Sequence, residues 1–208
     1  EGRWLQMMDA VPRLDGPTWR FPFYGMLAIG IASVSIGLLD GAVDRFGELA
    51  TAKKPEGSKR TLAERASGQV AHSTAEATAR STRAFLHDAI GEAWTTAAAG
   101  DPLTLEHRRS LRLAACDAAQ RCADALVTLG REAGGAAVYL REPLQRKIRD
   151  GQVAATHAMV APRIHELTGR LALGLERGVG GPGLEGAAQV GSGRRPSRPS
   201  ARPSSGPP

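Results

Sequence analysis

The sequence is poor in aromatic and β-branched residues, the types that strands favour. Aromatic side chains make up only 4% of the 208 residues, and this scarcity argues against a β-sheet. Alanine, leucine, arginine and glutamate dominate the middle of the chain, which favours helix. The chain has 208 residues, of which 42% are hydrophobic, and this is enough to form one sizeable core. We therefore predict an all-α domain.

Cysteine is nearly absent as well. Cys116 and Cys122 lie six residues apart within one helical pattern, so they cannot form a disulfide, whose Cβ atoms must approach within about 4.5 Å. The sequence has no C-x-x-C pair and no histidine at metal-ligand spacing. We predict two core thiols, no metal site and a reducing, cytoplasmic location.

No signal peptide is indicated, because the first residues carry neither a cationic segment nor a long apolar run. The chain begins at Glu1, so we expect residues 1–21 to be an irregular lead-in from a missing upstream domain. The longest apolar stretch, residues 21–39, is interrupted by glycines and serines and runs into Asp40. A membrane span needs about 20 mostly apolar residues, so we favour a buried bundle helix and expect no membrane partner.

Prolines, glycines and capping residues divide the next part of the chain into helices. Thr61 with Glu64 forms a capping-box pattern, and Thr104 opens another helix that Gly134 and Gly135 end. The helices that we expect cover residues 22–51, 61–98, 104–133 and 143–156, with a last segment to about 176 that is bent near Pro162.

Apolar residues recur at helical spacing in two of these segments, which predicts their buried stripes. Short turns join the helices, which favours an antiparallel four-helix bundle over residues 22–177. The predicted stripe of the first helix consists of Leu27, Ile31, Val34, Leu38, Ala42 and Phe46, and that of the third consists of Leu111, Ala115, Ala118, Cys122, Ala125 and Leu129.

From residue 178 onward glycine, proline, serine and arginine replace the apolar periodicity. Such a segment cannot offset the entropy of ordering it, so we predict a disordered basic tail over 178–208. Its charge could bind nucleic acid through counterion release, but it lacks interleaved aromatic residues and a recognition helix. A solvated terminus is the better interpretation, and we expect no nucleic-acid partner.

One segment near the end of the predicted bundle concentrates polar chemistry. It contains the spaced run Pro143, Arg146, Arg149 and Asp150, and a Gly-Gly pair at residues 134–135 precedes it. This pattern resembles the C-terminal helical domain of the acyl-CoA dehydrogenase superfamily, and the resemblance extends over about residues 22–177. It implies that domain's helical fold.

Dehydrogenases of this superfamily remove a carbon-bound proton with a glutamate shortly after the Arg-Asp pair. In these dehydrogenases the glutamate follows a tyrosine, and the resemblance aligns this Tyr-Glu pair with His157 and Ala158. Some members of the family carry the glutamate on the first helix instead, at a position that corresponds to about Leu27. No base is present at either place, although proton abstraction requires one within about 3 Å. His157 resembles the imidazole of the monooxygenase branch and is the catalytic candidate.

The resemblance implies a two-component monooxygenase that hydroxylates an aromatic or polycyclic small molecule through a C4a-peroxyflavin. An imidazole suits the stabilisation of this species or deprotonation of the substrate, since its unperturbed pKa is about 6.5. The implied cofactor is FAD or FMN, reduced by a partner reductase, and the implied assembly is a dimer or tetramer. Gly134, Gly135 and Arg131 would approach the cofactor.

Simpler roles for the same residues remain open. His157 could be an ordinary helix histidine, the Gly-Gly pair could be only a helix C-cap, and Arg146, Arg149 and Asp150 could form a structural ion-pair network. Two other functions also remain open. One is an acyl-CoA dehydrogenase-like oxidoreductase whose base lies elsewhere, and the other is a non-catalytic oligomerisation module.

Overall fold

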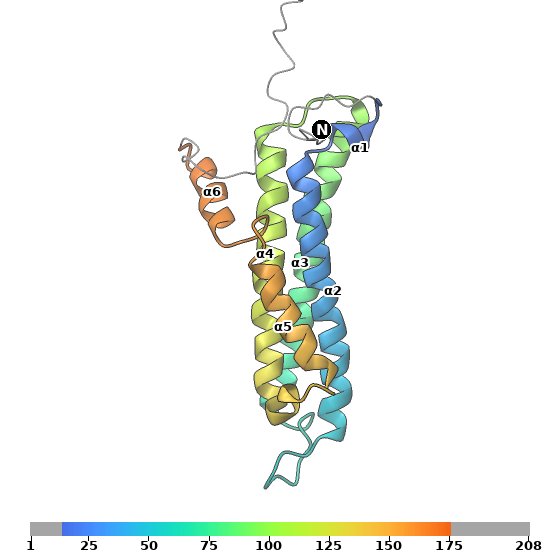
Figure 1. The fold of residues 1–208 in the computed structure, drawn as a ribbon, viewed down its shortest axis with the longest axis vertical. Helices are drawn as coiled ribbons and strands as arrows, with labels where there is room; N and C mark the ends of the chain where they lie inside the picture. The colour runs from blue at the N-terminus through green and yellow to red at the C-terminus, as the bar shows by residue number, and fades with distance from the viewer. Residues whose placement is uncertain (1–13, 176–208) are drawn as a thin grey trace, which may run out of the picture.

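The computed structural model describes residues 14–175, and every regular element in this range is a helix (Figure 1). The all-α prediction is confirmed. The predicted lead-in before residue 14 and the predicted tail over 178–208 lie outside the described residues. The elements are α1 (Pro17–Arg20), α2 (Phe23–Ala52), α3 (Ala66–Ala99), α4 (Leu105–Ala133), the 3₁₀-helix η1 (Gly134–Val138), α5 (Pro143–Ala155) and α6 (Arg163–Ala172).

Three long helices run the length of the bundle, and the fourth is short. α2 and α4 form a central pair, with α3 packed against both; α5 also packs against both but has no contact with α3. Figure 1 shows α5 along the lower half only, so that it does not cover α2 and α4 in the upper half. We call the end with Thr104 the upper end and the end with Gly134 the lower end.

Small side chains bring α2 and α4 together. Ala28, Ala32 and Ala42 of α2 are fully buried, as are Ala115 and Ala118 of α4, and the absence of longer side chains permits close helix approach. The predicted stripe of α4 is confirmed apart from Ala125, which is partly buried.

The predicted stripe of α2 is wrong over its first half. Leu27 is 43% exposed and Val34 57% exposed, because the smaller Ala28 and Ser35 next to them face the core instead. α2 is apolar nearly all round, so periodicity alone does not decide which side faces the core. The residues that are buried on α2 are Gly25, Ala28, Ala32, Ser35, Ile36, Leu39, Ala42, Val43, Phe46 and Ala50.

α3 begins five residues later than the Thr61–Glu64 pattern predicts. The Thr61 backbone N–H does donate to Glu64 Oε2 at 2.6 Å, but this bond closes a turn, and Arg65 is the N-cap of the helix. The delay has a clear cause. The N–H groups of Leu62 and Ala63 donate to carbonyls at the end of α2, which holds this segment against α2 and out of the helix.

The remaining helix ends agree closely with the sequence, except at Pro162. Thr104 caps α4 in a capping box with His107, and Gly134 ends it. At Pro162 the chain does not bend within one helix: residues 156–162 form turns, and Pro162 caps the separate α6, which contacts only α4 among the described elements. One helical turn, α1, also lies in the expected lead-in, since Pro17 can begin a helix.

By length and composition α2 meets the requirement for crossing a membrane, with a mean hydropathy of 1.9. A core helix of a soluble protein meets the same test. In this structure α2 packs against α3, α4 and α5.

Candidate functional site

The turn after α5 carries the catalytic candidate. His157 is exposed there, and its Nδ1 accepts a hydrogen bond from the Met159 backbone N–H at 3.2 Å. A neutral imidazole that accepts at Nδ1 carries its proton on Nε2. No described residue bonds to Nε2 and no described carboxylate pairs with His157, so this side of the ring is available as a donor.

A stripe of α4 side chains holds this turn in place. Gln120 Nε2 donates to the carbonyls of Ala155 and Val160 at 2.8 and 2.9 Å, and Cys116 Sγ donates to Val160 O at 3.2 Å. One helical turn further up, Arg112 Nη1 contacts Met159 Sδ at 3.2 Å. Residues four apart share one side of a helix, so a single side of α4 positions the His157 turn.

Both cysteines are fully buried and free, as predicted. Burial raises the pKa of the Cys116 thiol to about 11, and it does the same for Cys122. The reactive form of cysteine is the thiolate, so both side chains act as core thiols here. The part of the chain that the structure describes contains no cluster of residues that could hold a metal.

The Gly-Gly pair lies at the lower end, after α4. Gly134 has a φ of +58° and its N–H bonds to the carbonyls of Arg131 and Gly130, so the simpler interpretation as a helix C-cap holds for this glycine. Gly135 is exposed, with nothing within 4 Å of where a Cβ would stand. Its backbone can therefore be approached closely by a ligand.

Lys53, which the sequence analysis did not single out, joins this turn. Its ammonium donates to the carbonyl of Ala133, and it lies 3.8 Å from the position of a Cβ on Gly134. The exposed Arg131 lies in the last turn of α4, so a second cation belongs to the same end of the bundle. The lysine lies far away in sequence, just after α2, so no local motif indicates it.

His157 and the Gly-Gly turn lie at opposite ends of α5. The helix has 13 residues, which corresponds to about 20 Å at about 1.5 Å per residue. The structure therefore presents two separate groups of candidate residues rather than one.

The Arg-Asp run lies on the exposed side of α5. Arg146 Nε is 3.4 Å from Asp150 Oδ2, and Arg149 Nε is 3.8 Å from Asp150 Oδ1. All three side chains are at least 41% exposed, so these are surface ion pairs with small individual contributions to stability. Their geometry fits a structural role.

The start of α5 is fixed by a better protected ion pair. Arg45 of α2 donates from Nε and Nη2 to the two carboxylate oxygens of Glu142, at 2.7 and 2.9 Å. The Arg45 guanidinium lowers the pKa of Glu142, and the bond from the Leu144 N–H adds to this effect. Glu142 is also the N-cap of α5, so the pair ties the fourth helix to the bundle.

The chain matches a family model over residues 29–162, described as the acyl-CoA dehydrogenase C-terminal domain. The chain belongs to this family. Within it, the match spans most of α2, all of α3 to α5 and the turn that carries His157.

Several known proteins are similar to the chain. An indole-3-acetate monooxygenase of Pseudomonas putida is 29% identical over 83% of this chain and 44% of its own length. XiaF from Streptomyces, solved in complex with FADH2 and glycerol, superposes with a TM-score of 0.74 at 24% identity over 84% of this chain and 44% of its own. The 3-HSA hydroxylase from Rhodococcus sp. RHA1 gives 0.69 at 21% identity, over 77% and 41%. The chain thus spans less than half the length of these relatives.

Proposed function

We propose that the chain is the C-terminal part of a flavin-dependent monooxygenase that hydroxylates an aromatic or polycyclic small molecule. The observation that carries the proposal is the His157 turn, where an imidazole can donate from Nε2 and no described carboxylate pairs with it. The dehydrogenase reaction of this fold needs a carboxylate base. The similarity to an indole-3-acetate monooxygenase supports the same conclusion.

The tautomer of His157 favours one of two roles for the imidazole. Because Nδ1 of the ring accepts from the Met159 N–H, the proton lies on Nε2, which can donate a hydrogen bond. Nε2 could act as a base only if the proton moved to Nδ1, and that would break the bond from Met159. We therefore assign His157 to hydrogen-bond donation toward an oxygen atom that gains negative charge during the reaction. Deprotonation of the substrate is the less suitable role.

The Gly-Gly turn fits an anionic cofactor. Bare backbone at Gly135 and the cations Arg131 and Lys53 suit the phosphate groups of a flavin. Reduced FAD or FMN would supply the electrons that activate O₂, and XiaF, which shares the fold, was solved with FADH2. Arg131 and Gly135 would hold the cofactor's phosphate end, Gly134 would form the turn that presents them, and His157 would act near its reactive ring.

The separation of these groups favours an assembly of several copies. If each flavin met the His157 turn of one copy and the Gly-Gly turn of another, both groups would be used despite the length of α5 between them. We propose a homodimer or homotetramer, with a separate flavin reductase as the electron donor. The two buried free thiols are consistent with a cytoplasmic location.

Two experiments on the full-length protein test this function, one on flavin reduction and one on oxygen transfer. Protein with oxidised flavin is mixed anaerobically with an acyl-CoA, and we expect no reduction of the flavin. Protein with reduced flavin is then mixed with isotopically labelled O₂ and indole-3-acetate or another aromatic acid, and we expect the label in the product. Bleaching by the acyl-CoA would establish a dehydrogenase instead, and failure to bind any flavin would establish a non-catalytic module.

A further inference from the structure

The upper half of the bundle contains a buried arginine to which no described acid is paired. Arg112 of α4 is 1% exposed. Its Nη1 reaches the Tyr24 carbonyl, at a long 3.4 Å, and the thioether of Met159, a weak acceptor. Within residues 14–175, Nε and Nη2 have no hydrogen-bond partner, and no carboxylate forms an ion pair with this side chain.

The two free nitrogens of Arg112 are the pair that binds a carboxylate elsewhere in the same molecule. At the lower end, Arg45 uses Nε and Nη2 to hold both oxygens of Glu142. These two N–H groups lie side by side on the planar guanidinium, which matches the spacing of carboxylate oxygens. Arg112 therefore presents an intact carboxylate-binding edge to which no described residue bonds.

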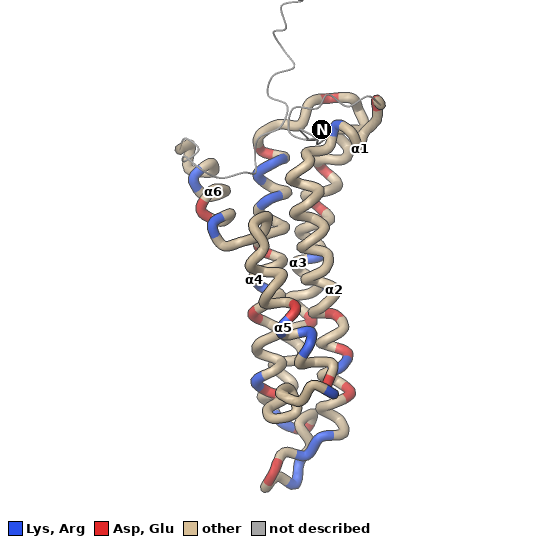
Figure 2. Tube along the Cα trace, in the orientation of Figure 1, with Lys and Arg blue, Asp and Glu red and all other residues tan. Residues whose placement is uncertain are grey.

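The surroundings of Arg112 increase its need for an anion. Burial lowers the pKa of Arg112, and the positive charge of Arg163 lowers it further, yet a guanidinium keeps its proton in proteins. Figure 2 shows basic residues along the upper half of α4, where Arg112 lies. A buried charge is costly unless it is paired and hydrogen-bonded, so this one calls for a negatively charged partner.

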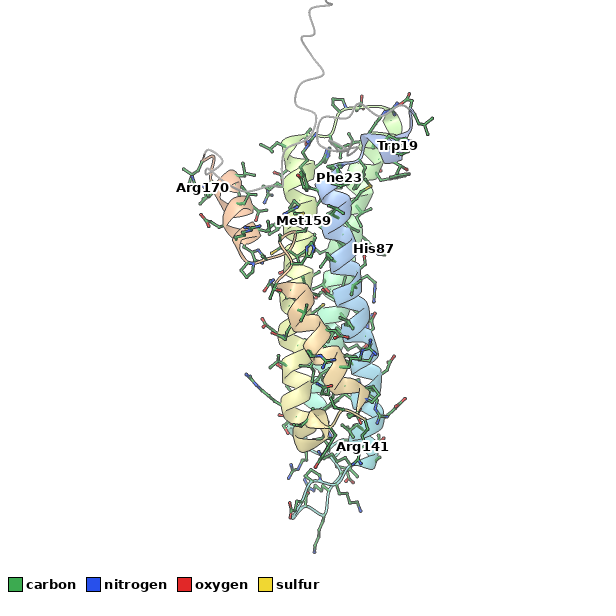
Figure 3. All side chains as sticks on the ribbon, in the orientation of Figure 1. Trp19, Phe23, His87, Arg141, Met159 and Arg170 are labelled. Atoms are coloured by element: carbon green, nitrogen blue, oxygen red, sulfur yellow. The ribbon has the colours of Figure 1, made fainter. Side chains whose placement is uncertain are left out.

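Arg112 and His157 meet at the same residue. Met159 donates its backbone N–H to His157 Nδ1, and its sulfur accepts from Arg112 Nη1. Figure 3 shows Met159 beside the upper half of α4. Methionine is unbranched and adapts readily to a changed environment, so Met159 can adjust when an anion binds the neighbouring Nε and Nη2 groups. Such an anion would lie close to the turn that carries the imidazole.

We propose that Arg112 binds the carboxylate of an organic-acid substrate through its Nε and Nη2 groups. This inference rests on the proposed monooxygenase function and narrows its substrates to aromatic acids. The carboxylate would fix one end of the molecule at Arg112, and its ring would extend toward His157. Arg112 is then a substrate-binding residue that selects acids over neutral analogues.

The test compares matched acids and amides. Full-length protein is titrated calorimetrically with indole-3-acetate against indole-3-acetamide, phenylacetate against phenylacetamide, and the corresponding pair of 3-phenylpropionic acid. For at least one pair we expect the acid to bind about 10- to 100-fold more tightly, the usual gain from a charge-assisted bidentate contact. Arg112→Met should abolish this preference, and Arg112→Lys should reduce it because a single ammonium lacks the two parallel donors. Equal binding of acid and amide in every pair would overturn the proposal, as would a preference that survives in Arg112→Met.

The stability of the ligand-free variants identifies any competing source of the carboxylate. If only a substrate pairs with Arg112, then Arg112→Met removes an unpaired buried charge from the ligand-free protein. The melting temperature of the full-length protein should then stay the same or rise. The matched control, Arg45→Met, leaves Glu142 without its partner and should lower the melting temperature without changing the acid preference. If Arg112→Met lowered it as much as Arg45→Met does, an acidic residue from elsewhere in the protein would occupy Arg112, and the proposal would be wrong.

These outcomes are separate from those that test the proposed function. Acid selectivity that depends on Arg112, without oxygen transfer, would retain the binding site and reject the monooxygenase. Oxygen transfer without acid selectivity would retain the monooxygenase and reject this role for Arg112.

Discussion

The two halves of the bundle differ in how an arginine is paired. In the lower half Arg45 is paired with Glu142, and α5 completes the packing around α2 and α4. In the upper half α5 is absent, and no described acid pairs with Arg112. The lower half pairs its arginine within the described chain, whereas the upper half leaves the charge of Arg112 without a described partner. The difference supports placing the proposed substrate site in the upper half.

Replacing the imidazole of the upper half should have the largest effect. In full-length protein His157→Ala should lower the yield of hydroxylated product by about 100-fold, the usual contribution of a proton-donating side chain. Flavin reoxidation would then release hydrogen peroxide instead of product, and both can be quantified in the same reaction. His165→Ala is the control, because His165 is also exposed but lies on α6. Equal losses in the two variants would contradict a specific role for His157.

Breaking the ion pair of the lower half should cost stability. Arg45→Met leaves the Glu142 carboxylate, only 10% exposed, without its guanidinium. We expect the free energy of unfolding to fall by about 2–3 kcal/mol, less than for a fully buried pair because Arg45 is partly exposed to solvent. Urea unfolding measures this change, and an unchanged midpoint would show that α5 does not depend on the pair.

The same pair should make the stability of the protein depend on pH in the acidic range. Arg45 lowers the pKa of Glu142 in the folded protein. The contribution of the pair to the free energy of unfolding is therefore complete above the ordinary carboxyl pKa of about 4.3, and it is lost as the pH falls through the lower pKa of Glu142 in the folded protein. Arg45→Met should remove this part of the pH dependence. Unfolding of both proteins between neutral pH and about pH 3 gives the comparison.

The close packing of α5 against α4 gives a smaller effect. A Cβ on Gly151 would collide with a terminal methyl of the fully buried Leu126, so Gly151→Ala should destabilise the bundle by about 1–2 kcal/mol. Chemical unfolding is again the measurement. Gly169→Ala on α6 is the control, since a Cβ there would meet nothing within 4 Å.

On α2 the sign of the same substitution should reverse. Gly30 and Gly37 have nothing within 4 Å of a Cβ position, so alanine at each should stabilise the described helix by about 1 kcal/mol through helix propensity alone. A loss of stability at either position in the full-length protein would mean that another domain or copy packs directly on that glycine. The two substitutions therefore map which parts of the exposed side of α2 are covered in the full-length protein.

Residues with strong local effects made much of the fold predictable. Pro143 begins α5, Thr104 caps α4 and Gly134 ends it, each through its own backbone or side-chain chemistry. The start of α3 was not predictable, because the bonds from Leu62 and Ala63 to the end of α2 are tertiary contacts. The buried side of α2 was not predictable either, since that helix is apolar on several sides.

The candidate site was predictable only where a motif marks it. His157 and Gly134 lie in the segment that resembles the family pattern, whereas Lys53 and Arg112 lie in other helices or at their ends. One signal for Arg112 does exist in the sequence. It precedes Cys116 and Gln120 at intervals of four, so all three lie on one side of α4, and the cysteine at the centre indicates that this side is buried.

α4 also sets a fixed distance within any assembly that this protein forms. Nineteen residues of one unbroken helix separate Arg112 from Arg131, a rise of about 29 Å at about 1.5 Å per residue. A helix stiffened by packing on three sides resists shortening, so neighbouring copies must arrange themselves to suit this length. In the proposed homo-oligomer, removing one heptad from the middle of α4 would therefore change how the copies fit together.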